Sequence, residues 1–385
     1  MHPLLTEQHE SFRQQIREFA ESEIKDIAGE LDENNVFSPE LTKKMGDLGL
    51  FGLNLPEQYG GKNLDTISYI IAVEELARID SSQAATVASH NSLGIGPIFQ
   101  FGNERQKSEL LPGFCTGERL WAFGLTEETA GSDARGTKTT AILENGNWVI
   151  NGSKIFITNS ASEISFGATL QVVTGEQNGV KELSAILVPR SSPGYFAERI
   201  YNKMMWRAAD TGMLDFRDCR VPEENLLGKR GLGARIMLKT LDGGRLAIAA
   251  MGLGLAQGAF EMALEYSRKR EQFGHPIGRN QAIAFKLADM DMKLELARNT
   301  LYKACLLKDR NEPYEHIAAI SKLYCSEIAK EIADQAVQIF GAYGLFKNNP
   351  IERFYRDQRI LQIGEGTSEI LRIVISRHLG LKNLT

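Results

Sequence analysis

AILENGNWVI, residues 141–150, contains two short apolar runs on either side of the dipeptide Asn145-Gly146. Asn-Gly between apolar runs is the strongest short-range signal for a β-hairpin. The next dipeptide, Asn151-Gly152, predicts another turn. Further short apolar runs follow at 154–158, 183–188 and 212–216. Because turn residues bound these runs, we predict a small antiparallel β-domain over residues 119–228.

The sequence before this segment has the period of helices. Phe12, Ile16 and Phe19 recur at i, i+4 and i+7, which places them on one helix face. Ser38-Pro39-Glu40 has the features of a helix start: an N-cap serine, a proline at the first helical position and an early acid. Further helical stretches lie at 70–79 and 106–111. We therefore predict an N-terminal helical domain over residues 1–118.

The helical period returns after the β-domain and continues to the end of the chain. One apolar seam is formed by Leu287, Met290, Leu294, Ala297 and Leu301. A second is formed by Ile317, Ile320, Tyr324, Ile328, Ile332 and Ile339, and it stops at Gly341 and Gly344. Long helices joined by short loops imply an antiparallel bundle. We predict a C-terminal four-helix bundle over residues 229–385, and for the whole chain an α+β, mainly helical fold.

Composition is that of an ordinary globular protein. A chain of 385 residues is too long for one compact core and predicts two or three domains. Its formal net charge of −5 gives no reason to expect nucleic acid or a membrane as a partner. No signal peptide is evident at the N-terminus. The longest unbroken apolar or glycine stretch, 246–256, is shorter than the roughly 20 residues of a membrane span.

The cysteines, the histidines and one missing motif further restrict the class of protein. The four cysteines show no CxxC spacing, which favours reduced thiols and a cytoplasmic location. The six histidines show no metal-ligand spacing, so no metal site is expected. The GxSxG nucleophile motif is absent from the sequence, which disfavours an α/β-hydrolase.

Four segments are candidate sites, and each has a plainer interpretation. Loop 123–133 combines small residues, hydroxyls and backbone N–H groups, which suit a polar ring or a phosphate but also an ordinary polar loop. Arg268-Lys269-Arg270 either caps a helix or holds a pyrophosphate. The glycines of 252–258 lack a preceding strand, so close helix packing is favoured over dinucleotide binding. Glu365, between two glycines, can project into a cleft or simply be solvated.

Taken together, the motifs resemble the acyl-CoA dehydrogenase family, in its short- or branched-chain, butyryl-CoA dehydrogenase-like part. The resemblance covers essentially the whole chain. Its motifs are Leu125-Thr126-Glu127 through Gly131-Ser132-Asp133, Arg270 through Phe273-Gly274 with Gln281, Gln338-Ile339-Phe340-Gly341, and Glu365-Gly366-Thr367-Ser368. It implies FAD as cofactor, a homotetramer built as a dimer of dimers, an electron-transfer flavoprotein as electron acceptor, and a role in fatty acid metabolism.

The resemblance also assigns roles to individual residues. The flavin ring and its near phosphates would contact Phe123, Leu125, Thr126, Gly131, Ser132, Phe156, Ile157 and Thr158, with Thr367 and Glu369 also touching FAD. The adenine end would be held from a neighbouring subunit by Arg270, Phe273, Gln281, Gln338, Gly341 and Ala342. The substrate would contact Ser132, Asp242, Arg245 and Gly366.

Glu365 is implied as the catalytic base. One branch of the family has its catalytic glutamate at this position, and another carries the base on a helix near Gly244, which here has no carboxylate. Glu365 would take the α-proton of an acyl-CoA thioester while the β-hydride passes to flavin N5, which yields a trans-2-enoyl-CoA. Desolvation by substrate should raise the Glu365 pKa and strengthen the base.

Two departures and three alternatives remain open. Glu128 and Thr129 stand where many members of the family have Pro-Gly, so the path of the flavin loop differs in sequence. Gly364 stands where several straight-chain enzymes carry a tyrosine, which predicts a larger acyl pocket for branched, cyclic or longer substrates. The alternatives are an acyl-CoA oxidase, an enoyl-CoA reductase of the same fold, and a catalytically silent acyl-CoA- or flavin-binding protein.

Overall fold

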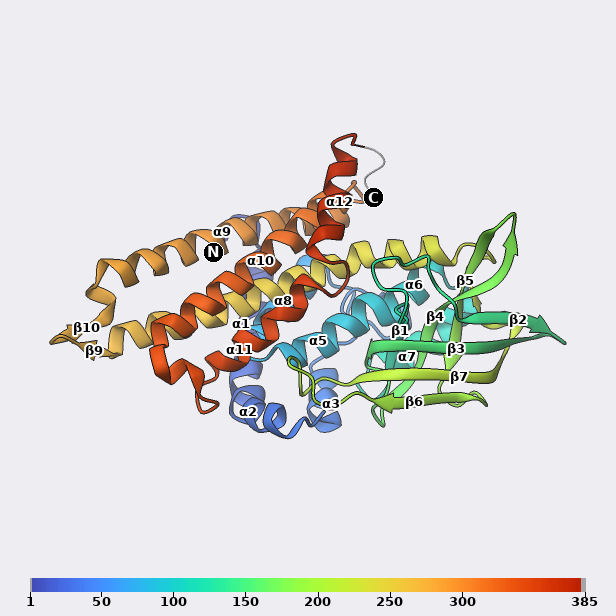
Figure 1. Ribbon diagram of the computed structural model, residues 1–385, viewed down its shortest axis with the longest axis horizontal. Coiled ribbons are helices and arrows are strands. Elements are labelled where there is room, and N and C mark those ends of the chain that lie inside the picture. Colours follow the sequence, from blue (N-terminus) through green and yellow to red (C-terminus); the bar gives the residue numbers. More distant parts are fainter. Residues whose placement is uncertain (1, 382–385) are drawn as a thin grey trace.

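The computed structural model describes residues 2–381 and has a helical region, a β-domain and a second helical region in that order along the chain (Figure 1). The first helices are α1 (Glu7–Phe19), α2 (Lys25–Asn34), α3 (Pro39–Asp47), α4 (Thr66–Ala77), α5 (Ser81–Ser89), α6 (Gly96–Phe101) and α7 (Glu104–Phe114). Ser38 is the N-cap of α3, and its hydroxyl accepts from Leu41 N–H at 3.1 Å, as the sequence predicts. A π-helical segment, η3 (His90–Ile95), joins α5 to α6.

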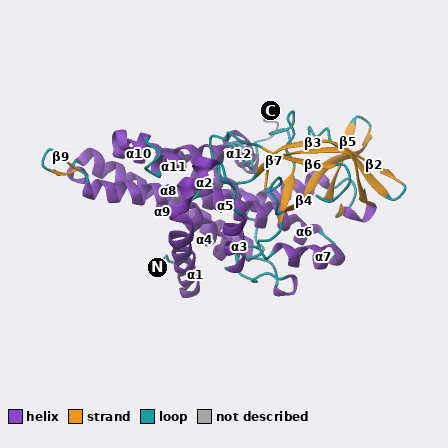
Figure 2. Cartoon of the chain, turned by 90° about the horizontal axis from the view of Figure 1, so that it is seen from below, coloured by secondary structure: helices purple, strands orange, loops and turns teal. Residues whose placement is uncertain are grey.

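The β-domain is built from β1 (Leu120–Gly124), β2 (Thr140–Glu144), β3 (Asn147–Thr158), β4 (Ser165–Gln177), β5 (Val180–Pro189), β6 (Tyr195–Arg199), β7 (Thr211–Pro222) and β8 (Leu226–Leu227). The strand order is β6-β7-β3-β2-β4-β5-β8, with β1 beside β4. The strands are collected at one end of the molecule (Figure 2). Asn145 and Gly146 both have positive φ and join β2 to β3, which confirms the predicted hairpin.

Two details of the sheet differ from the sequence prediction. The sheet is not wholly antiparallel, because β1 runs parallel to β4 and β2 meets β4 through one parallel pair. Asn151-Gly152 is not a turn but lies inside β3, where the pairing with β7 shifts register between Ile150 and Gly152. Gly152 has φ +137°, and a Cβ there would lie 2.7 Å from Thr139 Cα. Gly152 therefore permits both a bulge in β3 and the close approach of the backbone at Thr139.

The last region contains α8 (Gly233–Lys269), α9 (Gln281–Asp309), α10 (Glu315–Phe340), α11 (Ile351–Asp357) and α12 (Ser368–His378). A short hairpin of β9 (Glu271–Gln272) and β10 (His275–Pro276) connects α8 to α9. All five residues of the first predicted seam, Leu287 to Leu301, are buried in α9. Together with the helical N-terminal region and the middle sheet, these long helices confirm the predicted fold class, whereas the domain boundaries stay predictions.

The glycines of α8 allow its neighbours to approach the helix backbone. A Cβ on Gly252 would lie 2.8 Å from the Cys325 carbonyl oxygen of α10, and one on Gly254 would overlap the Glu74 carbonyl of α4. This confirms helix packing, rather than a dinucleotide loop, as the role of the run. Among the described residues α8 alone is long and apolar enough to cross a membrane. However, 78% of its most apolar window is buried inside the protein, as in the core helix of a bundle.

The two helical regions share one hydrophobic core, while the β-domain has its own around Trp148, Ile150 and Phe216. A third cluster, which includes Phe114, Trp121 and Ile236, connects the helices to the sheet. α12 begins near this junction in both views (Figures 1 and 2). The four cysteines are free and buried.

Candidate active site

Glu365 lies in the short loop that precedes α12. It has φ +53° and is followed by Gly366 with φ +101°, so two successive residues adopt left-handed or related backbone conformations. A left-handed conformation is costly for a residue with a Cβ and is worth a functional explanation. Thr367 then starts α12 as its N-cap, accepting from Ile370 N–H at 3.2 Å. The loop is thus a tight reversal fixed at its exit by the helix cap.

The carboxyl group of Glu365 points into the protein. Its Oε2 is buried and has no hydrogen-bond partner among the described residues. The group faces Gly244 of α8: a Cβ built on Gly244 would overlap Oε2 and would lie 2.9 Å from Cδ of Glu365. The same Cβ would be 3.0 Å from Leu93 Cδ2 of η3. The carboxyl group therefore occupies space that exists only because residue 244 has no side chain.

Two cations lie near this carboxyl group. Lys322 of α10 is fully buried, and its Nζ donates to the Gly366 carbonyl at 2.7 Å. Arg245 of α8 is largely buried and contacts Asp242 at 2.6 Å. Burial nevertheless dominates, and it raises the pKa of the Glu365 carboxyl to about 7 against the opposing influence of Lys322 and Arg245. A carboxyl group with this pKa can accept a proton near neutral pH.

Asp242 and Arg245 form a pair on the same face of α8, one helical turn apart. Burial raises the pKa of Asp242, although Arg245 and Lys239 lower it. The Arg245 Nε is buried and has no partner among residues 2–381. Buried polar atoms are normally paired, so this guanidinium has a donor free for a further ligand.

The segment after β1 is anchored through Glu127. Its carboxylate accepts from the backbone N–H groups of Lys138 and Thr139 at 2.7 and 3.1 Å, and from the Lys154 Nζ at 2.7 Å. Lys154 is fully buried and also donates to the Leu125 carbonyl at 3.2 Å. Ile155 N–H donates to the Thr126 carbonyl at 3.0 Å, which ties this segment to β3.

β3 presents an unusual aromatic residue beside that segment. Phe156 has φ +61° and a side chain that is 65% exposed, whereas Ile157 is buried in the β-domain core. A ligand can therefore contact the backbone of Ile157 and the ring of Phe156. Thr158 is half-buried. Gly131 and Ser132 on the adjoining loop are exposed. An exposed ring beside small residues and backbone groups fits a planar heterocycle such as the flavin ring.

A second group of predicted residues lies at the opposite end of the helical bundle, around the β9–β10 hairpin (Figure 1). The group consists of Arg270, Phe273, Gln281, Gln338, Gly341 and Ala342. Phe273 is 94% exposed with φ +55°, and the Arg270 guanidinium lies 5.6 Å from the centre of the Tyr343 ring. Within one chain the β9–β10 hairpin is far from β3, the strand that carries Phe156, in both views (Figures 1 and 2), so a single copy does not combine the two predicted ends of the FAD site.

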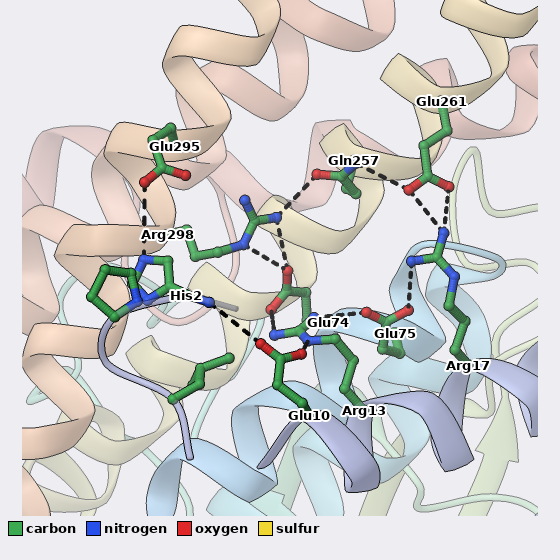
Figure 3. A pocket seen from close by; sticks show the side chains of 12 residues that line it. His2, Glu10, Arg13, Arg17, Glu74, Glu75, Gln257, Glu261, Glu295 and Arg298 are labelled. Atoms are coloured by element: carbon green, nitrogen blue, oxygen red, sulfur yellow. Dashed lines mark hydrogen bonds and ion pairs between the residues drawn. The ribbon is translucent and has the colours of Figure 1, made fainter. Parts of the chain in front are cut away.

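A cavity of about 440 Å³ lies elsewhere, among α1, α4, α8 and α9, and is lined by charged side chains (Figure 3). At its base, Glu74 contacts Arg298 at 3.0 Å, Arg13 at 3.3 Å and the Tyr302 hydroxyl at 2.7 Å. Burial opposes ionisation of Glu74, but Arg13 and Arg298 prevail and lower its pKa to about 2. The lining charges satisfy one another, so this cavity is a structural ion-pair network that joins four helices.

Family models match the chain over most of its length. They are described as the N-terminal domain of acyl-CoA dehydrogenase over residues 6–118, the middle domain over 122–219 and the C-terminal domain over 231–380. The chain belongs to the acyl-CoA dehydrogenase family. It is therefore an oxidoreductase, and the resemblance that the sequence motifs suggest is confirmed.

Individual relatives agree with this family assignment. The short-chain-specific acyl-CoA dehydrogenase of Clostridium acetobutylicum is 43% identical over 372 residues, which cover 97% of this chain and 98% of the relative. The butyryl-CoA dehydrogenase of Megasphaera elsdenii superposes with a TM-score of 0.94 at 39% identity, covering 98% and 99% of the two chains. A glutaryl-CoA dehydrogenase of Mycobacterium smegmatis solved with FADH2 has a TM-score of 0.94 at 28% identity, over 99% and 97%.

One further solved structure matches over the full length of both chains. A chain in the structure described as the electron transferring flavoprotein of Acidaminococcus fermentans has a TM-score of 0.96 and 42% identity, covering 100% of each chain. That work concerns flavin-based electron bifurcation.

Within the acyl-CoA dehydrogenase fold, the predicted residues form distinct groups. Glu365, Gly366, Asp242 and Arg245 are brought together where α8 meets the loop before α12. Leu125 and Thr126 are tied to the strand that carries Phe156 and Thr158, and Phe123 lies one residue before the end of β1, opposite Thr169 of β4. Thr367 caps α12, and Glu369 is exposed in its first turn.

Two side chains of the candidate site, Lys322 and Lys154, are not identified by the sequence patterns. Lys322 interrupts an otherwise small or apolar face, Ala318, Cys325 and Ala329, and a lysine at such a position is itself a signal of a buried charge. Glu127 belongs to a sequence motif, but that motif does not indicate its pairing with the buried Lys154. The spacing between Glu127 and Lys154 carries no regular pattern, so sequence alone could not pair them.

Proposed function

We propose that this acyl-CoA dehydrogenase removes the α-proton of an acyl-CoA thioester with Glu365 and forms a trans-2-enoyl-CoA. The observation that carries the proposal is the buried, unpartnered Oε2 of Glu365 in the space left by Gly244. A structural carboxylate would be paired at such a depth. A carboxyl group left free and raised to a pKa of about 7 is suited to accept a proton from a ligand.

The chain also has donors for the thioester oxygen. Among residues 2–381 the backbone N–H of Glu365 has no hydrogen-bond acceptor, so it is free to stabilise the enolate oxygen that develops as the α-proton leaves. Arg245, with its free Nε, is placed to bind the substrate on the α8 side. Substrate that excludes water from this space would raise the pKa of Glu365 further and strengthen it as a base.

FAD is the cofactor that this site fits, in keeping with the relatives solved with FADH2. Phe156, Thr158 and the loop from Leu125 to Ser132 would hold the flavin ring. Arg270, Phe273 and Gln281 would hold the adenine end of a neighbouring subunit's FAD. The chemistry that bound FAD supplies is acceptance of the β-hydride. The contribution of the chain is to keep the two faces of the substrate in register with base and cofactor.

The acyl pocket is proposed to be enlarged beside Gly364, so that it permits branched, cyclic or longer acyl groups. A Cβ on Gly364 would meet Ile360 at 3.5 Å or more, so a side chain is tolerated at this position but the sequence has none. A missing ring next to the base leaves room for substrate. Activity measured over acyl-CoAs of increasing length and branching checks this, and a sharp preference for butyryl-CoA would contradict it.

Assembly, electron transfer and location complete the proposal. A homotetramer would bring the exposed Arg270–Gln281 end of one chain to the Phe156 site of another. An electron-transfer flavoprotein is the proposed acceptor, in keeping with the A. fermentans match. Reduced enzyme that reoxidises slowly in air but rapidly with that acceptor would favour the dehydrogenase over an oxidase. The buried, free thiols are in keeping with a cytoplasmic location. Dehydrogenation of an acyl-CoA would give the protein a role in fatty acid metabolism.

The proposal is tested by adding a panel of acyl-CoAs to the flavin-loaded protein without oxygen and following bleaching of the flavin absorbance. Wild type should bleach with one group of thioesters. Glu365→Gln should bind FAD and acyl-CoA but bleach at least about 10³-fold more slowly, because the base is lost. The exposed Glu30→Gln variant is the control and should behave as wild type. Turnover retained by Glu365→Gln would sink the assignment.

A further inference from the structure

Lys322 is a buried cation without a contact ion pair. Its side chain is fully buried on α10, yet among the described residues no carboxylate lies within 4.0 Å of its Nζ. Its hydrogen bond is to the Gly366 carbonyl, at 2.7 Å. Burial of an ammonium group destabilises a protein unless the charge is compensated, so a lysine kept here without a contact carboxylate calls for an explanation.

We propose that Lys322 is a positioning residue for Glu365: its ammonium holds the Gly366 carbonyl against α10 and thereby sets the conformation in which the Glu365 carboxyl group faces Gly244. The inference deepens the function proposed above and rests on Glu365 being the base. It adds a role for α10, a helix from which the sequence motifs suggested only Gln338, near its far end.

Hydrogen bonds to α10 fix the loop that carries the base, and one of them runs from Gln362 Nε2 to the Glu327 carboxylate at 2.7 Å. Ser326 Oγ donates to the Leu361 carbonyl at 2.8 Å, and Lys322 Nζ donates to the Gly366 carbonyl at 2.7 Å. These residues are four apart and therefore lie on one face of the helix. Ser368 Oγ donates to the Glu327 carboxylate at 2.6 Å. The loop is thus held before, immediately after and beyond Glu365, and Lys322 is the charged donor among these contacts.

The middle contact acts where the backbone is most demanding. Glu365 at φ +53° and Gly366 at φ +101° leave the ordinary regions of backbone space. Such a conformation persists only where surrounding contacts impose it. A charge-assisted hydrogen bond to the Gly366 carbonyl orients the peptide directly after the base. Release of that carbonyl would let the segment relax, which would move both the carboxyl group and the Glu365 N–H.

The charge of Lys322 has a second effect, on the affinity of the base for a proton. The other charged or titratable groups that face Lys322 and Glu365 are Tyr69 of α4, Arg245 of α8, Glu327 of α10 and Glu369 of α12. Burial lowers the pKa of Lys322 to about 8, although Glu365 raises it, so the lysine is mainly cationic at neutral pH. A cation here lowers the pKa of Glu365 and keeps more of the base ionised.

The test is the pH dependence of anaerobic flavin reduction by a saturating acyl-CoA in the flavin-loaded protein. Because the base must be ionised, the rate rises with pH through the Glu365 pKa. Lys322→Met should lower the plateau rate at least about 10-fold and move the rising limb up by about 1 pH unit. Lys322→Arg, which keeps the charge, should leave the limb in place. Lys330→Met on an exposed part of α10 controls for loss of a lysine and should change neither.

Lys322→Gln separates the two effects, because an amide can still donate to the Gly366 carbonyl but carries no charge. It should move the limb as Lys322→Met does and lose less of the plateau rate. A Lys322→Met rate that is lower by the same factor at every pH, with the limb unmoved, would reduce Lys322 to a packing residue and overturn the proposal. If Glu365→Gln remained active, the base assignment itself would fail, which is a different result from failure of the lysine variants alone.

Folding of the variants provides a further measurement. If Lys322→Met does not fold, the double variant Lys322→Met/Glu365→Gln decides the matter, because removal of both charges should restore folding where the two are coupled. A double variant that fails to fold as well would overturn the proposal. Retained FAD content and circular dichroism spectra identify folded variants.

Discussion

Gly244→Ala should inactivate the protein without unfolding it. The new methyl group would overlap Oε2 of Glu365 and would lie 2.9 Å from its Cδ, whereas ordinary contacts begin near 3.4 Å. Glu365 has a flexible side chain, so the carboxyl group can swing away and the fold survives. The swing needed is on the order of 1 Å, and a displacement of that size costs roughly 10²-fold in rate. Alanine in place of glycine within α8 favours the helix by about 0.5–1 kcal/mol, which partly offsets the crowding.

The assay compares Gly244→Ala with Gly243→Ala, its neighbour in the same helix. A Cβ on Gly243 would come no closer than 4.0 Å to the Lys308 Nζ, so this variant gains the same helical preference without a clash. Flavin reduction by acyl-CoA, FAD content and thermal unfolding are measured for both. The expected result is a rate lower by about two orders of magnitude for Gly244→Ala alone, with both variants folded and flavin-bound. Equal rates for the two variants would refute the claim that the carboxyl group of Glu365 uses the space at Gly244.

Three further predictions concern stability. Because burial raises the folded-state pKa of Glu365 from 4.5 to about 7, its ionisation destabilises the fold as pH rises through that window. Between pH 5 and pH 8 the free energy of unfolding of wild type should therefore fall by about 2.5 kcal/mol more than that of Glu365→Gln, which corresponds to roughly 3 °C in Tm. Parallel curves of Tm against pH for the two proteins would contradict this. Lys154→Met leaves the Glu127 carboxylate without its buried partner. It should lower the free energy of unfolding by about 3 kcal/mol, measured by chemical denaturation, and weaken FAD binding, measured by flavin titration. Unchanged values of both would show that the pair is dispensable. Gly254→Ala, whose Cβ would overlap the Glu74 carbonyl, should destabilise by about 1–3 kcal/mol in chemical denaturation, and a gain in stability would disprove the close packing.

Much of the architecture could be predicted from the sequence because it depends on local patterns. The Asn145-Gly146 hairpin follows from two residues that tolerate positive φ, and the seam of α9 follows from helical spacing. Asn151-Gly152 shows the limit of this reasoning. The same residue types that make a turn also make a bulge inside a strand, and only the partner strands, β2 and β7, determine which one forms. The parallel pairing of β1 with β4 likewise depends on strands more than 40 residues apart.

In the candidate site, too, the local motif could be predicted from the sequence but the long-range contacts could not. The motif around Glu365 suggests the proposed base, but the burial of its Oε2 comes from α8, α10 and η3, which reach it from distant parts of the chain. A glutamate between two glycines has no pattern that distinguishes a solvated loop from a buried carboxyl group. The contact of Lys322 is unpredictable for a related reason: its partner is a backbone carbonyl, which every residue has, so no sequence pattern marks it.

Gly244 and Glu365 also have a consequence for how this protein can evolve. A side chain at 244 and the carboxyl group at 365 compete for one volume, so neither position is free to change by itself. A carboxylate gained on α8 while Glu365 remained would crowd two like charges into a single space, and loss of Glu365 first would remove the proposed base. Transfer of a base between the loop and the helix would therefore require two coordinated substitutions. Such a pair is expected to co-vary among descendants of this sequence, and each single change should be selected against on its own.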